Sequence, residues 1–304
     1  MSKKAFIFPG QGSQYIGMAK DLYDNSVEAI EMIKIADDAL GVNLSYIMFN
    51  GPEEQLKQTE FTQPAIFLHS VVLSSLIRTL QPDAAAGHSL GEYSALVSAN
   101  AIQFYDAVKL VRARGKAMQQ AGIENPGTLA AIVGLEPEKV EEFCKEASSE
   151  GIVQCANFNS PGQIVISGSL TGVRKAMELC KTGGAKIVKE LVVSGAFHSP
   201  LMKSAKDILL KELNDTPFYN ARFPVYANVT AKPVTQKDEI KKILYEQVTS
   251  PVRWEETIKN MIADGFDEFY EIGPGKVLQG LAKRINPDVK IFGIDKYEDV
   301  EKYL

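Results

Sequence analysis

The sequence is poor in the residues that build cross-links and metal sites. Its 304 residues include only three histidines and three cysteines, Cys144, Cys155 and Cys180. The cysteines are 11 and 25 residues apart, which fits neither a C-x-x-C pair nor a zinc-ligand spacing. An odd number of cysteines in a chain of this length also argues against a disulfide scaffold. We therefore expect reduced, buried thiols and no metal site.

Two further features are missing, an excess of positive charge and a long apolar run. Lys and Arg total 33 against 38 for Asp and Glu, without any basic run, which argues against nucleic-acid binding. No stretch approaches the roughly 18 apolar residues of a membrane span. The apolar residues before Pro9 are too few for a secretory signal. We expect a cytoplasmic protein that contacts neither membrane nor nucleic acid.

The composition that remains is that of a globular enzyme-sized chain. Hydrophobic residues make up 45% and charged residues 23% of the sequence. Because single cores stop growing at roughly 250 to 300 residues, this length favours two unequal domains.

Apolar runs and helix-spaced segments alternate along most of the chain. Residues 4–8 form a short apolar run that ends at Pro-Gly, as a buried parallel strand does. This alternation predicts an α/β fold with a parallel sheet core. The further predicted strands are 84–87, 225–229, 268–272 and 290–294, and the predicted helices are 64–80, 90–100, 240–247, 254–262 and 276–285.

The order of predicted strands and helices changes between residues 127 and 193, where it becomes β-α-β-β-α-β. This is the ferredoxin-like pattern. We therefore predict a larger α/β-hydrolase-like domain, residues 1–125 and 194–304, with a ferredoxin-like small domain inserted at 126–193. The predicted strands are 129–134, 152–157, 163–167 and 186–192, and the predicted helices are 136–149 and 171–182.

One motif carries a candidate nucleophile. Gly87-His88-Ser89-Leu90-Gly91 matches G-x-S-x-G and lies between a predicted strand and a predicted helix. A sharp turn there would expose the hydroxyl of Ser89. It would also let the backbone N–H of Leu90, at a helix N-terminus, face a developing oxyanion.

A serine nucleophile needs a base, and only three histidines are available. His69 lies in an apolar helical segment and is interpreted as structural. His88 adjoins the serine, and because consecutive side chains diverge at a tight turn, it is also interpreted as structural, at the edge of the site. His198, in a Gly-rich loop followed by Pro200, remains as the candidate base.

Two other segments could contribute to the site. The turn after the first strand contains Gly10 and Gly12 but has Tyr15 where a dinucleotide loop requires its third glycine. That turn could instead supply the N–H of Gln11 as a second oxyanion donor, or be a plain tight turn. Arg112, Arg114 and Lys116 form a solvated helix face or include a clamp for a substrate carboxylate, which these residues alone do not decide.

Taken together, seven segments resemble the family of malonyl-CoA:acyl carrier protein transacylases of dissociated fatty acid synthesis. The resemblance runs from about residue 4 to residue 295. The segments occur in the family's order and are Phe8–Gln14, Thr62–Ala65, Gly87–Tyr93, Arg114–Met118, Ala156–Gln163, Gly195–Pro200 and Ile272–Gly275.

The resemblance implies a ping-pong acyl transfer without a cofactor, in which malonyl-CoA and acyl carrier protein are the substrates. Ser89 matches the family's nucleophile and His198 its base, oriented by a backbone carbonyl that Gln247 supplies. Arg114 matches the arginine that pairs with the malonyl carboxylate. Phe197 matches a position that excludes methylmalonyl groups. Gln63, Gln11 and His88 are carried over as further pocket residues.

Three alternatives stay open with different weights. A serine thioesterase or lipase is disfavoured, because such chains have an acid between the serine and a histidine near the C-terminus. An acyltransferase that serves a polyketide synthase would share every motif. A catalytically inactive binding module is disfavoured because Ser89, His198 and Arg114 are all present.

We also expect a monomer with a basic patch for the acidic carrier protein. The candidate residues for that patch are Lys186, Lys189, Lys283 and Arg284.

Overall fold

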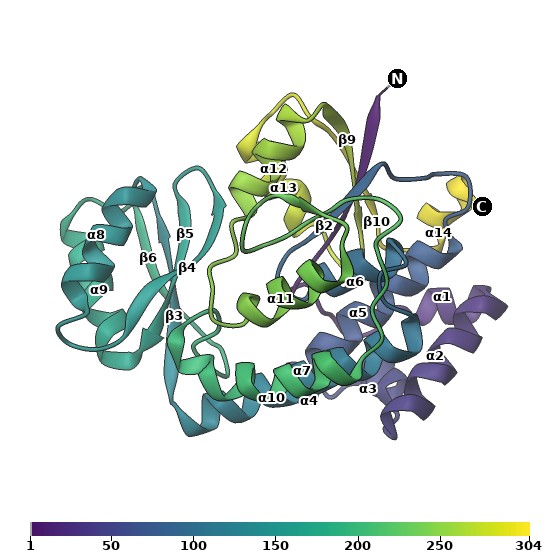
Figure 1. Ribbon diagram of the computed structural model, residues 1–304, viewed down its shortest axis with the longest axis horizontal. Helices are drawn as coiled ribbons and strands as arrows, with labels where there is room; N and C mark the ends of the chain where they lie inside the picture. The colour runs from purple at the N-terminus through teal and green to yellow at the C-terminus, as the bar shows by residue number, and fades with distance from the viewer. Residues whose placement is uncertain (1) are drawn as a thin grey trace.

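The computed structural model describes residues 2–304 and contains two sheets that lie beside each other (Figure 1). The larger sheet has six strands in the order β10-β9-β1-β2-β7-β8. Its strands are β1 (Lys3–Phe8), β2 (Ala84–Gly87), β7 (Val225–Tyr226), β8 (Pro233–Val234), β9 (Phe266–Ile272) and β10 (Lys290–Ile294).

The larger sheet is parallel except at one edge. Strand β8 was not predicted, and it pairs antiparallel with β7. The predicted strand 225–229 is also too long, because β7 ends at Tyr226 and the chain turns there. The N–H of Ala227 donates to the carbonyl of Lys232 at 3.0 Å, which closes this turn. The parallel core itself is confirmed.

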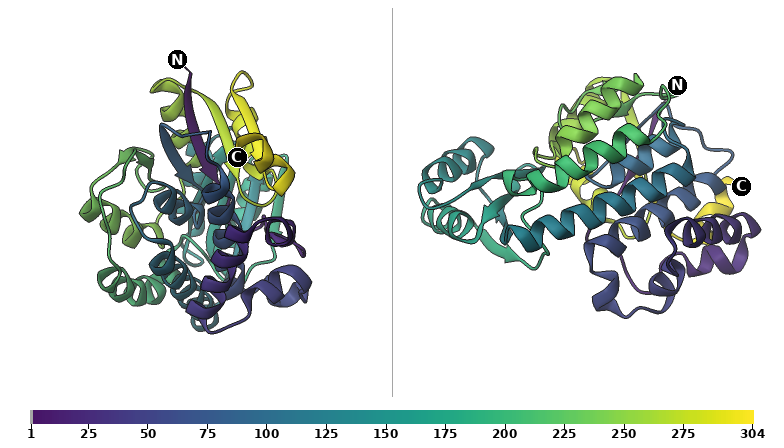
Figure 2. Two further views of the ribbon diagram at one scale, coloured as in Figure 1. Left: turned by 90° about the vertical axis from the view of Figure 1, so that its right-hand side faces the viewer. Right: turned by 60° about the horizontal axis from the view of Figure 1, so that its bottom comes forward.

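Strand β1 shows why the larger sheet needs helices on both faces. Phe6 and Phe8 pack into one buried cluster and Ala5 and Ile7 into another, so both faces of this strand are apolar. Helices on one face are α2 (Val27–Leu40), α5 (Thr59–Leu76) and α7 (Phe104–Glu124), whereas α12 (Trp254–Ala263) and α13 (Val277–Ile285) cover the other (Figure 2).

The remaining helices of the larger body connect these layers. Helix α5 begins at Thr59, earlier than the predicted 64, so that Pro64 lies inside its first turns. The other helices are α1 (Lys20–Asn25), α3 (Leu44–Asn50), α4 (Glu53–Leu56), α6 (Gly91–Ser98), α10 (Lys203–Asp215), α11 (Lys237–Gln247) and α14 (Tyr297–Val300).

The second sheet is antiparallel, with the strand order β4-β5-β3-β6. In chain order this is 2-3-1-4, which is the strand arrangement expected for the ferredoxin-like pattern. Its apolar side packs on two helices, through residues such as Ile132 and Ile166. Its elements are β3 (Gly127–Val133), α8 (Pro137–Ala147), β4 (Val153–Ser160), β5 (Gln163–Ser169), α9 (Leu170–Thr182) and β6 (Ile187–Leu191).

Main-chain hydrogen bonds at β4 join the second sheet to the segment that precedes α12 of the larger body. The N–H of Phe158 donates to the carbonyl of Val252 at 2.9 Å, and the N–H of Val252 donates to the carbonyl of Ala156 at 2.8 Å. All three cysteines lie buried and unpaired between the second sheet and its helices, as expected. Within residues 2–304, no helix combines the length and hydrophobicity needed to cross a bilayer.

Candidate active site

Ser89 sits at a strained turn between β2 and α6. Its φ is +52°, a left-handed conformation that non-glycine residues rarely adopt. A Cβ at Gly87 would lie 1.9 Å from the carbonyl carbon of Gly91, and a Cβ at Gly91 would lie 2.1 Å from the carbonyl oxygen of Phe8. Both motif glycines are therefore required by close backbone approach.

The amide of Asn228 holds this turn from both sides. Its Oδ1 accepts a hydrogen bond from the N–H of Ser89 at 2.6 Å, and its Nδ2 donates to the carbonyl of Gly87 at 2.6 Å. The side chain is fully buried. Sequence analysis missed Asn228, because it lies inside the predicted strand 225–229, whereas the observed strand β7 ends at Tyr226.

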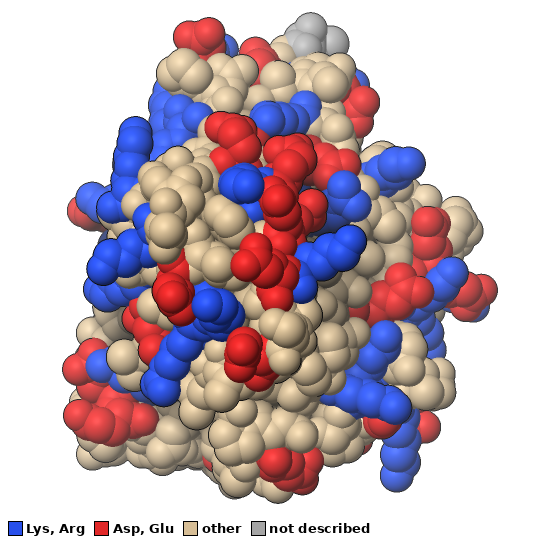
Figure 3. Space-filling view, turned by 90° about the vertical axis from the view of Figure 1, so that its left-hand side faces the viewer, with Lys and Arg blue, Asp and Glu red and all other residues tan. Residues whose placement is uncertain are grey.

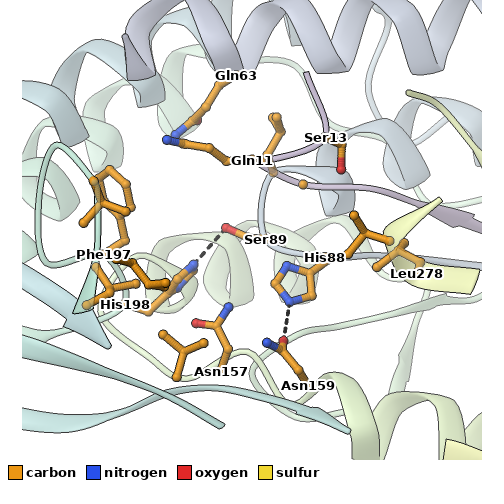
Figure 4. A pocket seen from close by; sticks show the side chains of 18 of the residues that line it. Gln11, Ser13, Gln63, His88, Ser89, Asn157, Asn159, Phe197, His198 and Leu278 are labelled. Carbon is orange, nitrogen blue, oxygen red and sulfur yellow. Dashed lines mark hydrogen bonds between the residues drawn. The ribbon is translucent and has the colours of Figure 1, made fainter. Parts of the chain in front are cut away.

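Ser89 and His198 are in hydrogen-bond contact. Ser89 Oγ lies 2.8 Å from His198 Nε2 (Figure 4). On the other side of the ring, Nδ1 lies 2.9 Å from the carbonyl oxygen of Gln247 and 3.1 Å from that of Ser250. Because carbonyl oxygens only accept, Nδ1 carries the proton and Nε2 is free to accept the proton of Ser89.

Burial keeps the imidazole of His198 neutral. Desolvation lowers its pKa to about 3, and the positive charge of Arg114 acts in the same direction, while the carbonyls of Gln247 and Ser250 oppose the shift. His198 also has a positive φ of +57°. A strained backbone thus carries both partners of the Ser–His pair.

Arg114, on α7, is a buried cation beside the serine. Its side chain is 1% exposed, and it donates to Ser89 Oγ at 3.1 Å, to Gln63 Oε1 at 2.6 Å and to Gln247 Oε1 at 2.9 Å. The guanidinium also lies over the ring of Tyr93, 5.5 Å from its centroid. Across residues 2–304, no carboxylate forms a salt bridge with it within 4.0 Å, and the buried Glu92 acts on its charge only at longer range. An anionic group bound in the cavity would therefore find an unpaired positive charge.

Glu92 is a buried carboxyl group behind the serine that sequence analysis did not single out. Its Oε2 accepts from the N–H of Asn228 at 3.0 Å and from Gln247 Nε2 at 2.8 Å. Gln247 Nε2 also donates to the carbonyl of Ser89 at 3.0 Å. Burial raises the pKa of Glu92 to about 7, against the effect of these hydrogen bonds.

A cavity of about 320 Å³ opens over Ser89 and His198, between the two sheets. One wall is apolar and includes Leu129 and Val165 from the second sheet and Leu281 from α13. All of the predicted site residues except Gln247 line it, namely Gln11, Gln63, His88, Ser89, Leu90, Arg114, Phe197 and His198.

The other histidines and basic residues have different surroundings. His88 Nε2 lies 2.9 Å from Asn159 Oδ1, and the ring packs on Trp254. His69 is fully buried away from the cavity, with Nε2 2.8 Å from the carbonyl oxygen of Asp295. Arg112 forms an ion pair with Glu60 at 3.0 Å. Of Arg112, Arg114 and Lys116 on α7, only Arg114 lines the cavity.

The four candidate docking residues do not lie together. Arg284 donates to Gln163 Oε1, and Gln163 lines the cavity. Lys189 is two residues from Leu191, another lining residue, and so lies on the same side of β6. Lys283 is bound to the carbonyls that follow its own helix, and Lys186 lines a separate depression beside α9.

Comparison with known proteins agrees with this geometry. Residues 5–289 match the family model of the acyl transferase domain. The malonyl CoA-acyl carrier protein transacylase of Staphylococcus aureus is 46% identical over 302 residues, which covers 99% of this chain and 98% of that protein. The chain belongs to the malonyl CoA-acyl carrier protein transacylase family.

Solved members of the transacylase family have the same fold. The structure of the Coxiella burnetii transacylase has a TM-score of 0.95 at 39% identity, covering 99% of this chain and 96% of that one. A malonyl-transacylase solved in complex with its type II polyketide acyl-carrier protein has a TM-score of 0.95 at 40% identity, covering 100% and 99%.

Proposed function

We propose that the protein transfers a malonyl group from coenzyme A to the phosphopantetheine thiol of acyl carrier protein, and so supplies fatty acid biosynthesis. The observation that carries the proposal is the contact of Ser89 with two groups of different function. One is the neutral base His198, and the other is the buried, unpaired cation Arg114. The first suits acyl transfer, and the second suits an acyl group that ends in a carboxylate.

In the first half-reaction, Ser89 Oγ attacks the thioester carbonyl while its proton passes to His198 Nε2. The tetrahedral intermediate collapses, the C–S bond breaks, and the coenzyme A sulfur leaves with the proton from His198. The carbonyls of Gln247 and Ser250 hold the ring during both transfers. A neutral carbonyl stabilises the imidazolium less than a carboxylate would. His198 is therefore a weaker base, and it accepts a proton only from a donor that is well placed.

The backbone N–H groups of Gln11 and Leu90 are our candidates for the oxyanion hole. Both residues line the cavity together with Ser89. Leu90 immediately precedes α6, and N–H groups at a helix N-terminus are not used within the helix. Two such donors would stabilise the negative oxygen of both tetrahedral intermediates.

Substrate choice is assigned to Arg114 and Phe197. Arg114 would exchange its contact with Ser89 for the malonyl carboxylate. Phe197 is buried in the cavity wall next to His198, where its ring leaves little room for a methyl branch on the acyl group. Gln63 would hold the guanidinium of Arg114 in place through its 2.6 Å hydrogen bond. His88, bound to Asn159, would shape the wall of the cavity without taking part in proton transfer.

In the second half-reaction, the carrier thiol gives its proton to His198 Nε2 and its sulfur attacks the seryl ester. The ester C–O bond then breaks, and Ser89 Oγ takes the proton back from His198. A carrier protein must reach the mouth of the cavity. Lys189 and Arg284 are therefore the favoured docking residues, because they are the two candidates that lie next to residues lining the cavity. The face that includes the second sheet carries Lys and Arg side chains interspersed with Asp and Glu rather than one uniform basic patch (Figure 3). Docking there would depend on a few local charges.

The relative bound to a polyketide carrier supports a second candidate, an acyltransferase that serves a polyketide synthase. Its chemistry would be the same and only the acceptor would differ. A thioesterase is less well supported, because His198 is oriented by two carbonyls and not by an acid.

Kinetics with both substrates varied tests the proposal. A ping-pong transferase gives parallel double-reciprocal lines when malonyl-CoA is varied at several fixed concentrations of a fatty acid carrier protein. Intersecting lines would contradict the covalent route. Faster transfer to a polyketide carrier than to a fatty acid carrier would favour the second candidate.

We also propose residues 126–193 as a separate ferredoxin-like domain, inserted into a catalytic domain of residues 1–125 and 194–304. We further propose that the protein is monomeric and cytoplasmic. Sedimentation of the purified chain tests the first of these two properties, since a dimer would have about twice the mass.

A further inference from the structure

One side chain of the second sheet reaches the loops that carry and orient His198. Gln154, on β4, donates from Nε2 to the carbonyl of His198 at 2.8 Å and to the carbonyl of Thr249 at 3.2 Å. It is half-buried and does not line the cavity. The two acceptors are 44 and 95 residues away in sequence, so this single amide adds a second link between two segments that also meet through the ring of His198.

Each segment carries one part of the base. His198 has a positive φ, and a residue in that conformation persists only where its surroundings hold it. Thr249 lies between Gln247 and Ser250, whose carbonyls accept the Nδ1 proton of His198. The amide of Gln154 therefore fixes the position of the histidine backbone relative to the carbonyls that orient its ring.

General stability of the sheet does not require this contact. Strand β4 is already paired with β5, and main-chain hydrogen bonds with Val252 attach it to the larger body. The two hydrogen bonds of Gln154 add one specific restraint, between the base and its orienting loop.

We propose that Gln154 is a positioning residue that sets the geometry of His198 for proton transfer with Ser89. The inference rests on the proposed role of His198 as the base. It makes the second sheet part of the catalytic frame, although none of its residues would exchange a proton with the substrate.

Three variants test the inference. Gln154→Met keeps the length of the side chain but has no hydrogen-bond donor. Gln154→Glu keeps the shape of the side chain, and its carboxyl group can donate one hydrogen bond only when it is protonated. Gln120→Met, at an exposed glutamine on α7 that bonds only Glu124, is the matched control. For each we would measure the rate and KM of Ser89 acylation by malonyl-CoA from pH 5 to 8, and the rate of labelling by phenylmethylsulfonyl fluoride.

We expect Gln154→Met to acylate roughly tenfold to a hundredfold more slowly than the unmodified chain, because small displacements of a catalytic group have effects of that size. The KM for malonyl-CoA should stay unchanged, and sulfonyl fluoride labelling should slow in parallel. Gln154→Glu should be slow at pH 8 and recover as pH falls and its carboxyl group protonates. A purely structural role would move neither the labelling rate of the folded protein nor the pH profile.

Acylation and labelling rates of Gln154→Met equal to those of Gln120→Met would overturn the inference while leaving the proposed function intact. Failure of the unmodified chain to form an acyl-enzyme would instead contradict the proposed function itself. A loss of rate accompanied by a raised KM, with labelling unchanged, would also overturn the inference, because it would place Gln154 in substrate binding.

Discussion

Arg114 and Ser89 are in direct contact, with Nη2 of the guanidinium 3.1 Å from Oγ of the serine. The same oxygen lies 2.8 Å from His198 Nε2. The serine hydroxyl therefore donates to the histidine and accepts from the arginine, so its proton points toward His198 Nε2. The positive charge also stands where a carboxylate two carbons from the reacting carbonyl could reach it.

Replacing Arg114 should reduce the preference for malonyl-CoA over acetyl-CoA more than it reduces the rate of acyl transfer itself. Loss of one partner of a buried ion pair costs on the order of 3–5 kcal/mol. We expect Arg114→Ala to narrow the preference for malonyl-CoA over acetyl-CoA by roughly 10²- to 10³-fold. The ratio of acylation rates for the two thioesters measures this, and Arg112→Ala, which removes contacts with Glu60 and with the ring of Phe61 but does not touch the cavity, is the control. An unchanged ratio would remove Arg114 from substrate recognition.

Shortening Phe197 should admit a branched acyl group. The ring lies in the cavity wall beside the base, so Phe197→Ala opens space next to the acyl carbon that a methylmalonyl group would occupy. We expect the rate with methylmalonyl-CoA relative to malonyl-CoA to rise. The ratio is unaffected by a lower fraction of folded protein, which matters because truncating a buried phenylalanine costs about 3–5 kcal/mol of stability. A ratio that stays constant would assign selectivity elsewhere.

Asn228 should support the conformation of the nucleophile. Asn228→Ala removes both of the 2.6 Å hydrogen bonds that hold the turn at Ser89, leaving a buried donor and a buried acceptor without partners. Each unpaired group costs about 1–3 kcal/mol. We expect lower unfolding free energy by urea titration, together with slower acylation at temperatures where the variant is fully folded.

Asn228→Asp separates the two contacts of this side chain. It retains an acceptor for the N–H of Ser89 but loses the donor to Gly87. If Asn228→Asp acylates as slowly as Asn228→Ala, the hydrogen bond to the N–H of Ser89 does not determine the acylation rate.

Acylation should be almost independent of pH between 5 and 6.5. The pKa of His198 is lowered to about 3, chiefly by burial, so the ring stays neutral and competent as a base well below its usual value of 6.5. Protonation would remove the base only as pH falls toward about 3. Single-turnover acylation rates measured in this range test this, and a tenfold loss per pH unit below 6.5 would contradict it.

The protonation of His198 should also make the free energy of unfolding depend on pH. The unfolded chain binds a proton at His198 below about pH 6.5 and the folded chain does not, so His198 destabilises the fold as pH decreases from 6.5 toward 3. Glu92, whose pKa is raised to about 7, acts oppositely and destabilises the fold as pH rises from 4.5 to 7. Urea titrations of Glu92→Gln against the unmodified chain should show the second effect disappear, and an unchanged pH dependence would contradict the assignment.

The elements that sequence analysis predicted well are those whose own residues determine them. Strand β1 is an apolar run buried on both faces, and the β-α-β-β-α-β order of residues 127–193 predicted the elements of the second sheet. The G-x-S-x-G turn was predictable because close backbone approach at Gly87 and Gly91 leaves no alternative residue.

The parts that were missed depend on contacts across the fold. Asn228 and Gln154 are ordinary polar residues in sequence, and their partners lie up to 141 residues away. Strand β8 is only two residues long and forms because a local turn brings it to the edge of the sheet. The carbonyls that orient His198 leave no trace in side-chain identity, so only the family resemblance had pointed to Gln247.

Intact-protein mass spectrometry tests the central claim most directly. The protein would be mixed briefly with malonyl-CoA and then with phosphopantetheinyl acyl carrier protein, with Ser89→Ala treated in parallel. The account predicts a malonyl adduct on Ser89, its absence in Ser89→Ala, and its transfer to the carrier with the corresponding gain in carrier mass. A malonyl adduct in Ser89→Ala, or decay to free malonate with the carrier unmodified, would contradict it.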